Sequence, residues 1–90
     1  MACVKPDGSL TATGLAALEV LAGTGTVPAL ALAKALGKPL FAARGILREL
    51  GAAGLAERAA QEGPVEPAAE AHRITPAGRE SLARGGAVAR

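Results

Sequence analysis

Apolar side chains recur at spacings of three and four residues in several stretches of the chain, which is the pattern of helices with one buried face. The first predicted helix begins at a capping threonine, Thr11 or Thr13, whose hydroxyl can accept a hydrogen bond from a free amide of the first turn. It ends at about Ala22, before a Gly-Thr-Gly sequence, and its apolar stripe contains Leu15 and Leu18. This stripe must pack against other elements.

The centre of the chain predicts two further helices separated by a tight turn. A β-branched residue before Pro28 favours a short extended segment. A second helix is predicted over 29–36 and ends where Gly37 can take the left-handed conformation. A third helix is predicted over 39–53, with Pro39 in its first turn, where a missing amide hydrogen is tolerated. The inward positions of the third helix are predicted to be Ala43, Ile46, Leu47 and Leu50, and the outward positions Phe41, Arg44, Gly45 and Arg48.

A β-hairpin is predicted after the third helix. Residues 55–58 and 72–75 are short segments of alternating character, and Leu55 and Ile74 would face the same way if the two segments pair as antiparallel strands. The stretch 59–71 between them contains glycine and proline and has no apolar periodicity. It is therefore predicted to be a loop.

Thr75 followed by Pro76 is a strong helix start, and it predicts a fourth helix over 76–84. The order of helix, extended segment, helix, turn, helix and hairpin is that of a winged helix-turn-helix. We therefore expect a mainly α fold with a small β-hairpin, consisting of a three-helix core, a wing and a short C-terminal helix. The domain is expected over 10–84, with an irregular arm at 1–9 and a flexible tail at 85–90.

The charge distribution separates a basic centre from an acidic loop. In a chain of 90 residues with a net charge of +2, the segment from Val20 to Arg48 contains four cations and no anion. The segment from Glu57 to Glu70 contains four glutamates and one arginine. A patch of one sign attracts partners of the opposite sign, so the centre of the chain suits a polyanion, although both segments could equally be solvated faces.

The composition offers little for catalysis or metal binding. A single cysteine and a single histidine allow no internal disulfide and no structural metal site, so we expect no enzyme activity, no cofactor and no metal. A redox role for Cys3 in the arm is left open, against an ordinary free thiol. A pH-sensing role for His72 is also left open, against a partly buried hairpin residue.

The longest apolar run, 27–33, is too short to cross a bilayer. The first residues lack the apolar stretch that follows a basic start in a secretory signal. We therefore expect no membrane association and a cytoplasmic location.

Three segments also resemble bacterial transcriptional regulators of the MarR, PadR and ArsR types. Residues 32–37 (LAKALG) resemble the second helix of these proteins, and residues 46–55 (ILRELGAAGL) are similar to the end of their recognition helix. Residues 72–80 (HRITPAGRE) look like their exit from the wing. The resemblance covers roughly Leu10 to Leu82 and implies that the third helix enters a DNA major groove, with the hairpin on the backbone or minor groove nearby.

On this resemblance we expect sequence-specific binding of double-stranded DNA by a small transcriptional regulator, acting as a homodimer through the arm and the first helix. A small-molecule effector cannot be read from the sequence. Arg44 and Arg48 share one face and can form paired hydrogen bonds with guanine, whereas Lys34 and Lys38 suit phosphates. The expected DNA-binding residues are Lys34, Lys38, Phe41, Arg44, Arg48, Arg58 and Arg73.

The alternative is a winged-helix module that binds another protein and has little or no affinity for DNA. Its surface would include Phe41, because exposed aromatic side chains often mark contacts. It would also include the acidic loop with Glu62, Glu66 and Glu70, which phosphates would repel. The predicted recognition face has Phe41, Ala42 and Gly45 where the regulators usually carry small polar side chains.

Overall fold

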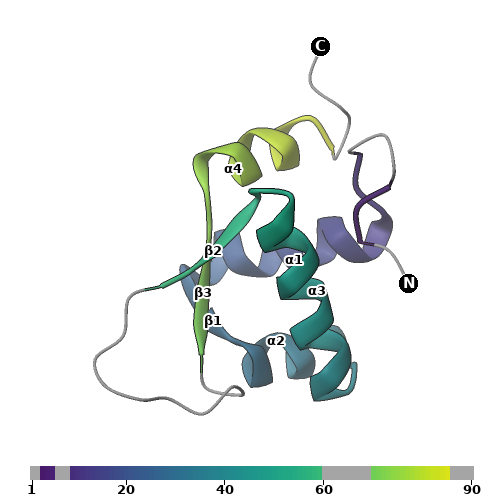
Figure 1. Ribbon diagram of the computed structural model, residues 1–90, viewed down its shortest axis with the longest axis vertical. Helices are drawn as coiled ribbons and strands as arrows, with labels where there is room; N and C mark the ends of the chain where they lie inside the picture. Colours follow the sequence, from purple (N-terminus) through teal and green to yellow (C-terminus); the bar gives the residue numbers. More distant parts are fainter. Residues whose placement is uncertain (1–2, 6–8, 60–69, 86–90) are drawn as a thin grey trace.

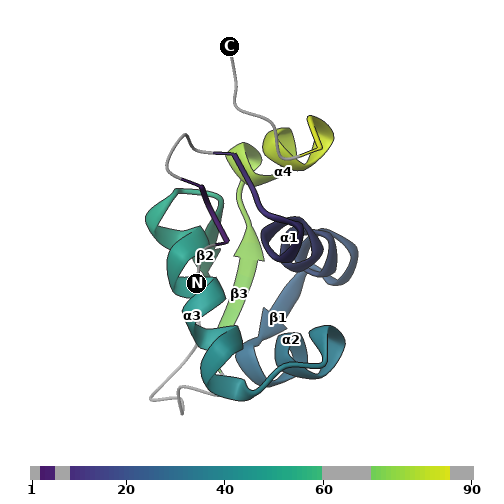
Figure 2. The ribbon, with the colours of Figure 1, turned by 90° about the vertical axis from the view of Figure 1, so that its right-hand side faces the viewer.

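The computed structural model describes residues 3–5, 9–59 and 70–85, and its described part contains four helices and a three-stranded antiparallel sheet (Figures 1 and 2). Helix α2 lies at one end of the molecule and α4 at the other, and in Figure 2 α3 lies to the left of β3 and α1 to its right. The elements are α1 (Ala12–Thr24), β1 (Thr26–Pro28), α2 (Ala29–Leu36), α3 (Leu40–Ala52), β2 (Ala56–Arg58), β3 (Ala71–Ile74) and α4 (Pro76–Ala83).

The helix ends follow the capping chemistry of the sequence with small shifts. Of the two candidate caps of α1, Thr11 is the one used, because its Oγ1 accepts a hydrogen bond from the Gly14 amide at 3.2 Å. Helix α1 continues to Thr24, two residues beyond the predicted end. The bounds of α2 agree with the prediction, and Gly37 has a φ of 65° in the left-handed region. Pro39 precedes α3 as its N-cap and does not belong to its first turn.

The sheet contains the predicted hairpin and one additional strand. Strands β2 and β3 are antiparallel, with Ala56 opposite Ile74. The extended segment at Val27 forms β1, which pairs with the other edge of β3 and places Val27 opposite His72. The local pattern predicted the extended backbone of β1 but could not identify its partner, because the two strands are far apart in the sequence. Strand β3 is therefore the centre of the sheet, in the order β1-β3-β2.

The core is aliphatic and lies between α1, α2, α3 and the sheet. Its fully buried large side chains include Leu18, Leu21, Leu32, Ile46 and Leu50. All four positions predicted to face inward on α3 are buried, and so are Leu55 and Ile74. The core fixes α3 along the side that bears these residues, and this leaves the opposite side of the helix exposed.

Cys3 and Leu10, which precede α1, pack into this core. Cys3 is completely buried, and its carbonyl oxygen accepts hydrogen bonds from the Thr11 amide at 3.0 Å and from Thr11 Oγ1 at 3.2 Å. Val4 forms an isolated β-bridge with Leu10, which is also buried. The prediction of an irregular arm did not foresee this burial of Cys3, because its hydrogen-bonding partners, Thr11 and Glu49, lie farther along the chain than a local pattern reaches.

Thr75 joins three elements. Its Oγ1 donates a hydrogen bond to the Gly54 carbonyl oxygen at 2.7 Å and accepts one from the Gly78 amide at 3.0 Å. Its own amide donates to the Leu55 carbonyl oxygen at 3.1 Å. A Cβ atom at Gly78 would lie 2.1 Å from that same Leu55 oxygen, so only glycine fits there. The end of α3, the start of β2 and the start of α4 are thus held together.

The predicted loop lies mostly outside the described residues, as do most of the predicted arm and tail. The division into a domain over 10–84 with an arm and a tail stays a prediction.

Candidate nucleic-acid interface

The exposed side of α3 carries one stripe of side chains. Phe41, Arg44, Gly45 and Arg48 lie at helical spacings of three and four residues, which brings them onto a single face. Phe41 is 77% exposed, and Arg44 and Arg48 are also exposed. Within the described part of the chain neither arginine has an ion-pair partner. Both guanidinium groups therefore have their donors available to a ligand.

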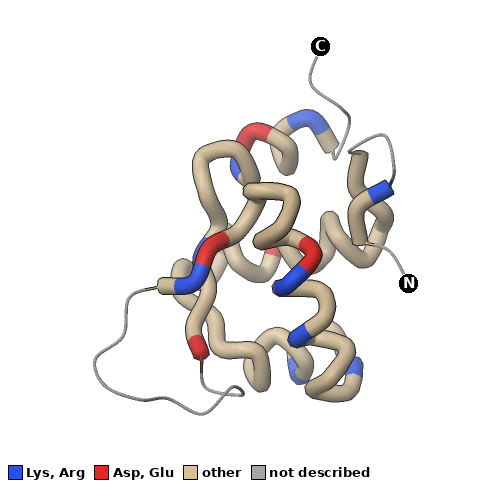
Figure 3. The backbone as a smooth tube through the Cα atoms, in the orientation of Figure 1, with Lys and Arg blue, Asp and Glu red and all other residues tan. Residues whose placement is uncertain are grey.

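Two lysines flank the start of this stripe. Lys34 is exposed on α2, and Lys38 is half-buried in the turn between α2 and α3. Figure 3 shows the blue segments of these basic residues along α3 and around α2 at one end of the molecule. The structure thus brings Lys34, Lys38, Phe41, Arg44 and Arg48 together on the helix-turn-helix unit.

The two arginines of the wing have a different environment. Arg58 on β2 forms an ion pair with Glu70 at 2.7 Å, and Arg73 on β3 forms one with Glu57 at 2.7 Å. Sequence reasoning identified both arginines as contacts to DNA but did not foresee these partners. Both pairs join the two sides of the hairpin, and Glu57 lies directly opposite Arg73 in the register. The described part of the wing therefore carries compensated charges.

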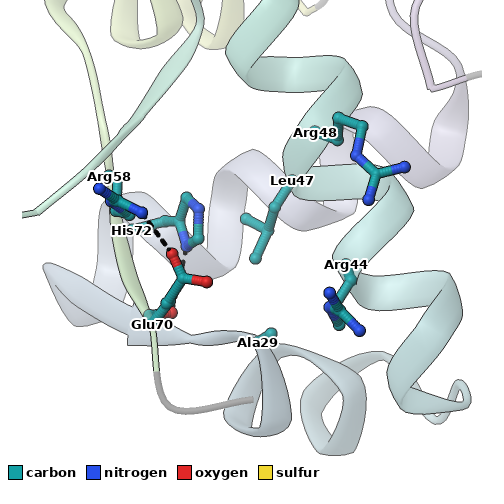
Figure 4. Close-up of a pocket in the computed structure, with 7 residues that line it drawn as sticks. All are labelled: Ala29, Arg44, Leu47, Arg48, Arg58, Glu70 and His72. Carbon is teal, nitrogen blue, oxygen red and sulfur yellow. Dashed lines mark hydrogen bonds and ion pairs between the residues drawn. The ribbon is translucent and has the colours of Figure 1, made fainter. Parts of the chain in front are cut away.

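A hollow of about 350 Å³ lies between α3 and the wing (Figure 4). Arg44 and Arg48 lie on its helix side, and Arg58, Glu70 and His72 lie on its wing side. Nδ1 of His72 lies 3.2 Å from the Glu70 carbonyl oxygen. The complete lining is Ala29, Arg44, Leu47, Arg48, Arg58, Glu70 and His72.

Sequence reasoning missed four of the lining residues, namely Ala29, Leu47, Glu70 and His72. His72 was considered only for a pH-sensing role. Leu47 was correctly predicted as a core residue, and it also forms part of the floor of the hollow. Ala29 is the first residue of α2 and carries no chemical signal. Glu70 was assigned to an acidic loop, and its pairing with Arg58 depends on the hairpin register, which alternation alone does not determine.

The arrangement of cations around the hollow is suited to bind an anion. No three His, Cys, Asp or Glu side chains come together among the described residues in a way that could hold a metal ion. In the same ranges, no helix has both the length and the apolar character needed to cross a membrane. The dominant chemistry is a group of cations on one exposed helix face.

Cys3 is completely buried and is unsuited to act as a reactive thiolate. Burial raises the pKa of its thiol to about 11, and the carboxylate of Glu49 acts in the same direction. A thiol of this kind stays protonated near neutral pH, and reactivity requires the thiolate.

The architecture is that of a winged helix-turn-helix: α2, a tight turn and α3 form the helix pair, and β2 and β3 form the wing. Solved structures of MarR family regulators match this chain. Apo MarR from E. coli matches with a TM-score of 0.71 at 21% identity, over 83% of this chain and 54% of that chain. NMB1585, a MarR family regulator from Neisseria meningitidis, matches with a TM-score of 0.70 at 24% identity, over 83% of this chain and 51% of that one.

BpsR from Bordetella bronchiseptica, whose DNA binding is regulated by 6-hydroxynicotinic acid, matches with a TM-score of 0.73 at 25% identity over 88% of this chain and 55% of that chain. No family model and no curated protein matches the sequence. The chain spans about half the length of the solved structures it matches. It has a MarR-like winged-helix fold, which confirms the predicted fold class and the resemblance to MarR-type regulators.

Proposed function

We propose that this protein is a transcriptional regulator that binds double-stranded DNA sequence-specifically, with α3 in the major groove. The observation that carries this proposal is the pair Arg44 and Arg48, which lie one helical turn apart on the exposed face of α3 without an acidic partner among the described residues. A guanidinium group can donate two parallel hydrogen bonds to the O6 and N7 atoms of guanine.

The lysines have a separate role in the proposal. Lys34 and Lys38 lie on α2 and in the turn before α3, beside the stripe that would face the bases. An ammonium group is a point charge without the planar fork of an arginine, so it suits a phosphate. The two lysines would fix the position of α3 in the groove and contribute affinity that does not depend on sequence.

The wing would lie next to the DNA backbone through Arg58 and Arg73. Because both arginines are already paired with glutamates, the wing contributes less affinity than the helix does in this proposal. The hollow between α3 and the wing has cations on both sides and would accept part of the phosphate backbone.

We also propose that the protein binds as a homodimer. A single chain presents one recognition helix, and regulators of this architecture commonly read two half-sites related by symmetry. Sedimentation at micromolar concentration, with and without DNA, tests the dimer. A monomer under both conditions would contradict it.

The central experiment is selection of binding sequences from a pool of random duplexes, followed by measurement of affinity against salt concentration. A specific binder enriches a defined sequence, and its affinity falls steeply with salt because phosphate contacts release counterions. A pool that shows no enrichment, together with binding that salt does not weaken, would contradict the proposal.

The second candidate is a protein-binding module. Two exposed apolar side chains favour it: Phe41, 77% exposed on α3, and Leu30, 46% exposed on α2. If the protein binds no duplex at low salt, this candidate replaces the first.

A further inference from the structure

The exposed face of α3 offers few kinds of side chain for contacts with a ligand. Its hydrogen-bonding side chains are Arg44 and Arg48, which only donate. The one acidic side chain of α3, Glu49, is half-buried and accepts a hydrogen bond from the Cys3 amide at 3.0 Å. The remaining exposed side chains on this helix are apolar, and Phe41 is the only large one among them.

This set restricts how base edges can be contacted. The amino groups of adenine and cytosine are donors in the major groove and need an acceptor such as Asn, Gln, Glu or Asp. The exposed stripe of α3 has no such acceptor. The arginines can contact the two acceptors of guanine, and an apolar side chain such as Phe can contact the C5-methyl group of thymine.

Gly45 adds an independent observation. It lies inside α3, where glycine destabilises a helix by about 0.5–1 kcal/mol relative to alanine. A Cβ atom at this position would meet no atom within 4 Å, so nothing in the fold requires glycine. The missing side chain leaves a gap one turn from both Phe41 and Arg48, and such a gap allows a ligand to approach the helix backbone closely.

The surroundings of Phe41 favour DNA over an apolar protein surface as the occupant of this gap. Lys38 lies just before α3, and Arg44 lies one turn after Phe41. An aromatic ring between cations is suited to a polyanion that also presents methyl groups.

We propose that α3 reads A·T pairs through the thymine methyl group, with Phe41 as the specificity-determining residue and Gly45 as the space that admits the base edge, while Arg44 and Arg48 read guanine. This inference rests on the proposed DNA binding and specifies its chemistry. Phe41 is exposed, so replacing it leaves the core intact.

The test uses the duplex obtained by selection from the random pool. Each thymine is replaced in turn by deoxyuridine, which lacks only the methyl group, and affinity is measured for the wild-type protein and for Phe41→Ala. For the wild type, at least one replacement should weaken binding about fourfold, the value for one buried methyl-sized group. For Phe41→Ala, the same replacement should have no effect. Leu30→Ala, a control that removes an exposed leucine from α2, should keep the full fourfold effect.

Several outcomes separate this inference from the proposed function. If the wild type binds the selected duplex but no uracil replacement weakens it, the methyl contact is overturned and DNA binding stands. If Phe41→Ala remains as sensitive to uracil as the wild type, the assignment to Phe41 is overturned. If the wild type enriches no duplex at all, both the proposed function and this inference fail.

Gly45→Ala provides a second test with two readouts. The midpoint of urea unfolding should rise, because alanine favours the helix, whereas DNA affinity should fall several-fold because the gap is filled. The matched control is Gly23→Ala on α1, where a Cβ atom also meets no atom within 4 Å. That variant should be stabilised without any loss of affinity. If Gly45→Ala binds DNA as tightly as the wild type, the proposed close approach of a base edge to the helix backbone at Gly45 is overturned.

Discussion

The amide of Cys3 donates a hydrogen bond to Oε1 of Glu49 at 3.0 Å, across 46 positions of the sequence. This contact ties the segment around Cys3 to the last turn of the proposed recognition helix. Because Cys3 also bonds to Thr11 at the cap of α1, the same short segment connects α1 with α3. The orientation of α3 thus depends on residues that no helix-turn-helix pattern includes.

Replacement of Glu49 should test this connection. Glu49→Ala removes the acceptor and leaves the Cys3 amide unsatisfied, so we expect a loss of about 1.5 kcal/mol in the free energy of unfolding. Glu49→Gln keeps an acceptor and should lose less. Urea unfolding monitored by circular dichroism measures both changes. If Glu49→Ala is as stable as the wild type, the hydrogen bond between Cys3 and Glu49 does not hold the segment around Cys3 against α3.

The Cys3 thiol should make stability depend on alkaline pH. Its pKa is raised from 9.0 to about 11 in the folded protein, so the folded state favours the protonated thiol. The resulting stabilisation is complete below about pH 9 and is lost as the pH rises through about 11. The chain contains no tyrosine, so no phenol contributes to the pH dependence of stability in this window.

Thermal unfolding at a series of pH values measures this effect, and Cys3→Ala is the control that removes only the thiol. The decline of the wild type should be steeper than that of Cys3→Ala. Parallel profiles would contradict the prediction.

The recognition arginines should contribute to binding and little to folding. Arg44→Ala and Arg48→Ala should each weaken specific binding by roughly 1–3 kcal/mol and relax specificity at one position if the arginine contacts a base. Lys34→Ala should lower affinity for all sequences and reduce the salt slope by about one unit. Fluorescence anisotropy on the selected duplex and on a scrambled duplex distinguishes these patterns.

The matched control for the arginine variants is Arg79→Ala, because Arg79 is an exposed arginine on α4, at the end of the molecule opposite α2 (Figure 1). It should bind like the wild type. If both α3 variants also bind like the wild type, α3 is not the reading helix, and the protein-binding candidate gains support.

Removal of the glutamate charges that pair with the two wing arginines should strengthen DNA binding. Glu70→Gln and Glu57→Gln remove the charged partners of Arg58 and Arg73, so each freed cation becomes available to a phosphate. Affinity should rise, and the salt slope should become steeper by up to about one unit for each freed arginine. Stability should fall by no more than about 1 kcal/mol, because the pairs are at the surface.

The ion pair between Glu80 of α4 and Arg84, which directly follows this helix, provides the control for the wing. Glu80→Gln frees an arginine at the end of the molecule opposite α2. That variant should leave affinity unchanged. Weaker binding by both wing variants would show that the glutamates are needed to hold the hairpin in place.

The glycine at position 78 should be the least replaceable residue of α4. A Cβ atom there would lie 2.1 Å from the Leu55 carbonyl oxygen, and Gly78→Ala must therefore displace either α4 or the start of β2. We expect a loss of up to about 3 kcal/mol, at the upper end of typical overpacking effects. Pro76→Ala, at an exposed position of the same helix, should have a much smaller effect. Equal stabilities of the two variants would contradict the close contact.

Most of the fold could be predicted from the sequence because its signals are local. The helices were predicted from apolar spacing and from caps such as Thr11 and Thr75, and the hairpin from the alternation around Leu55 and Ile74. What could not be predicted were contacts between segments far apart in the chain. The pairing of β1 with β3 and the burial of Cys3 belong to this group.

The candidate site could likewise be predicted from the sequence only where it depends on local patterns. Helical spacing placed Arg44 and Arg48 on one exposed face, as the structure has them. The ion pairs of Arg58 and Arg73 depend on the strand register and on Glu70, which lies just before β3, so a count of charges could not identify them. The assignment of the seven DNA-binding residues stays a prediction.

The junction at Thr75 has a consequence for how the protein unfolds. One hydroxyl bonds to the end of α3 and to the first turn of α4, and the amide of the same residue bonds to the start of β2. Unfolding of the first turn of α4 therefore also breaks the hydrogen bonds from Thr75 to Gly54 and Leu55, which hold the base of the wing. Amide hydrogens of β2, β3 and α4 should exchange with solvent in a single cooperative opening, separate from the slower exchange of amides in the core of α1 and α3.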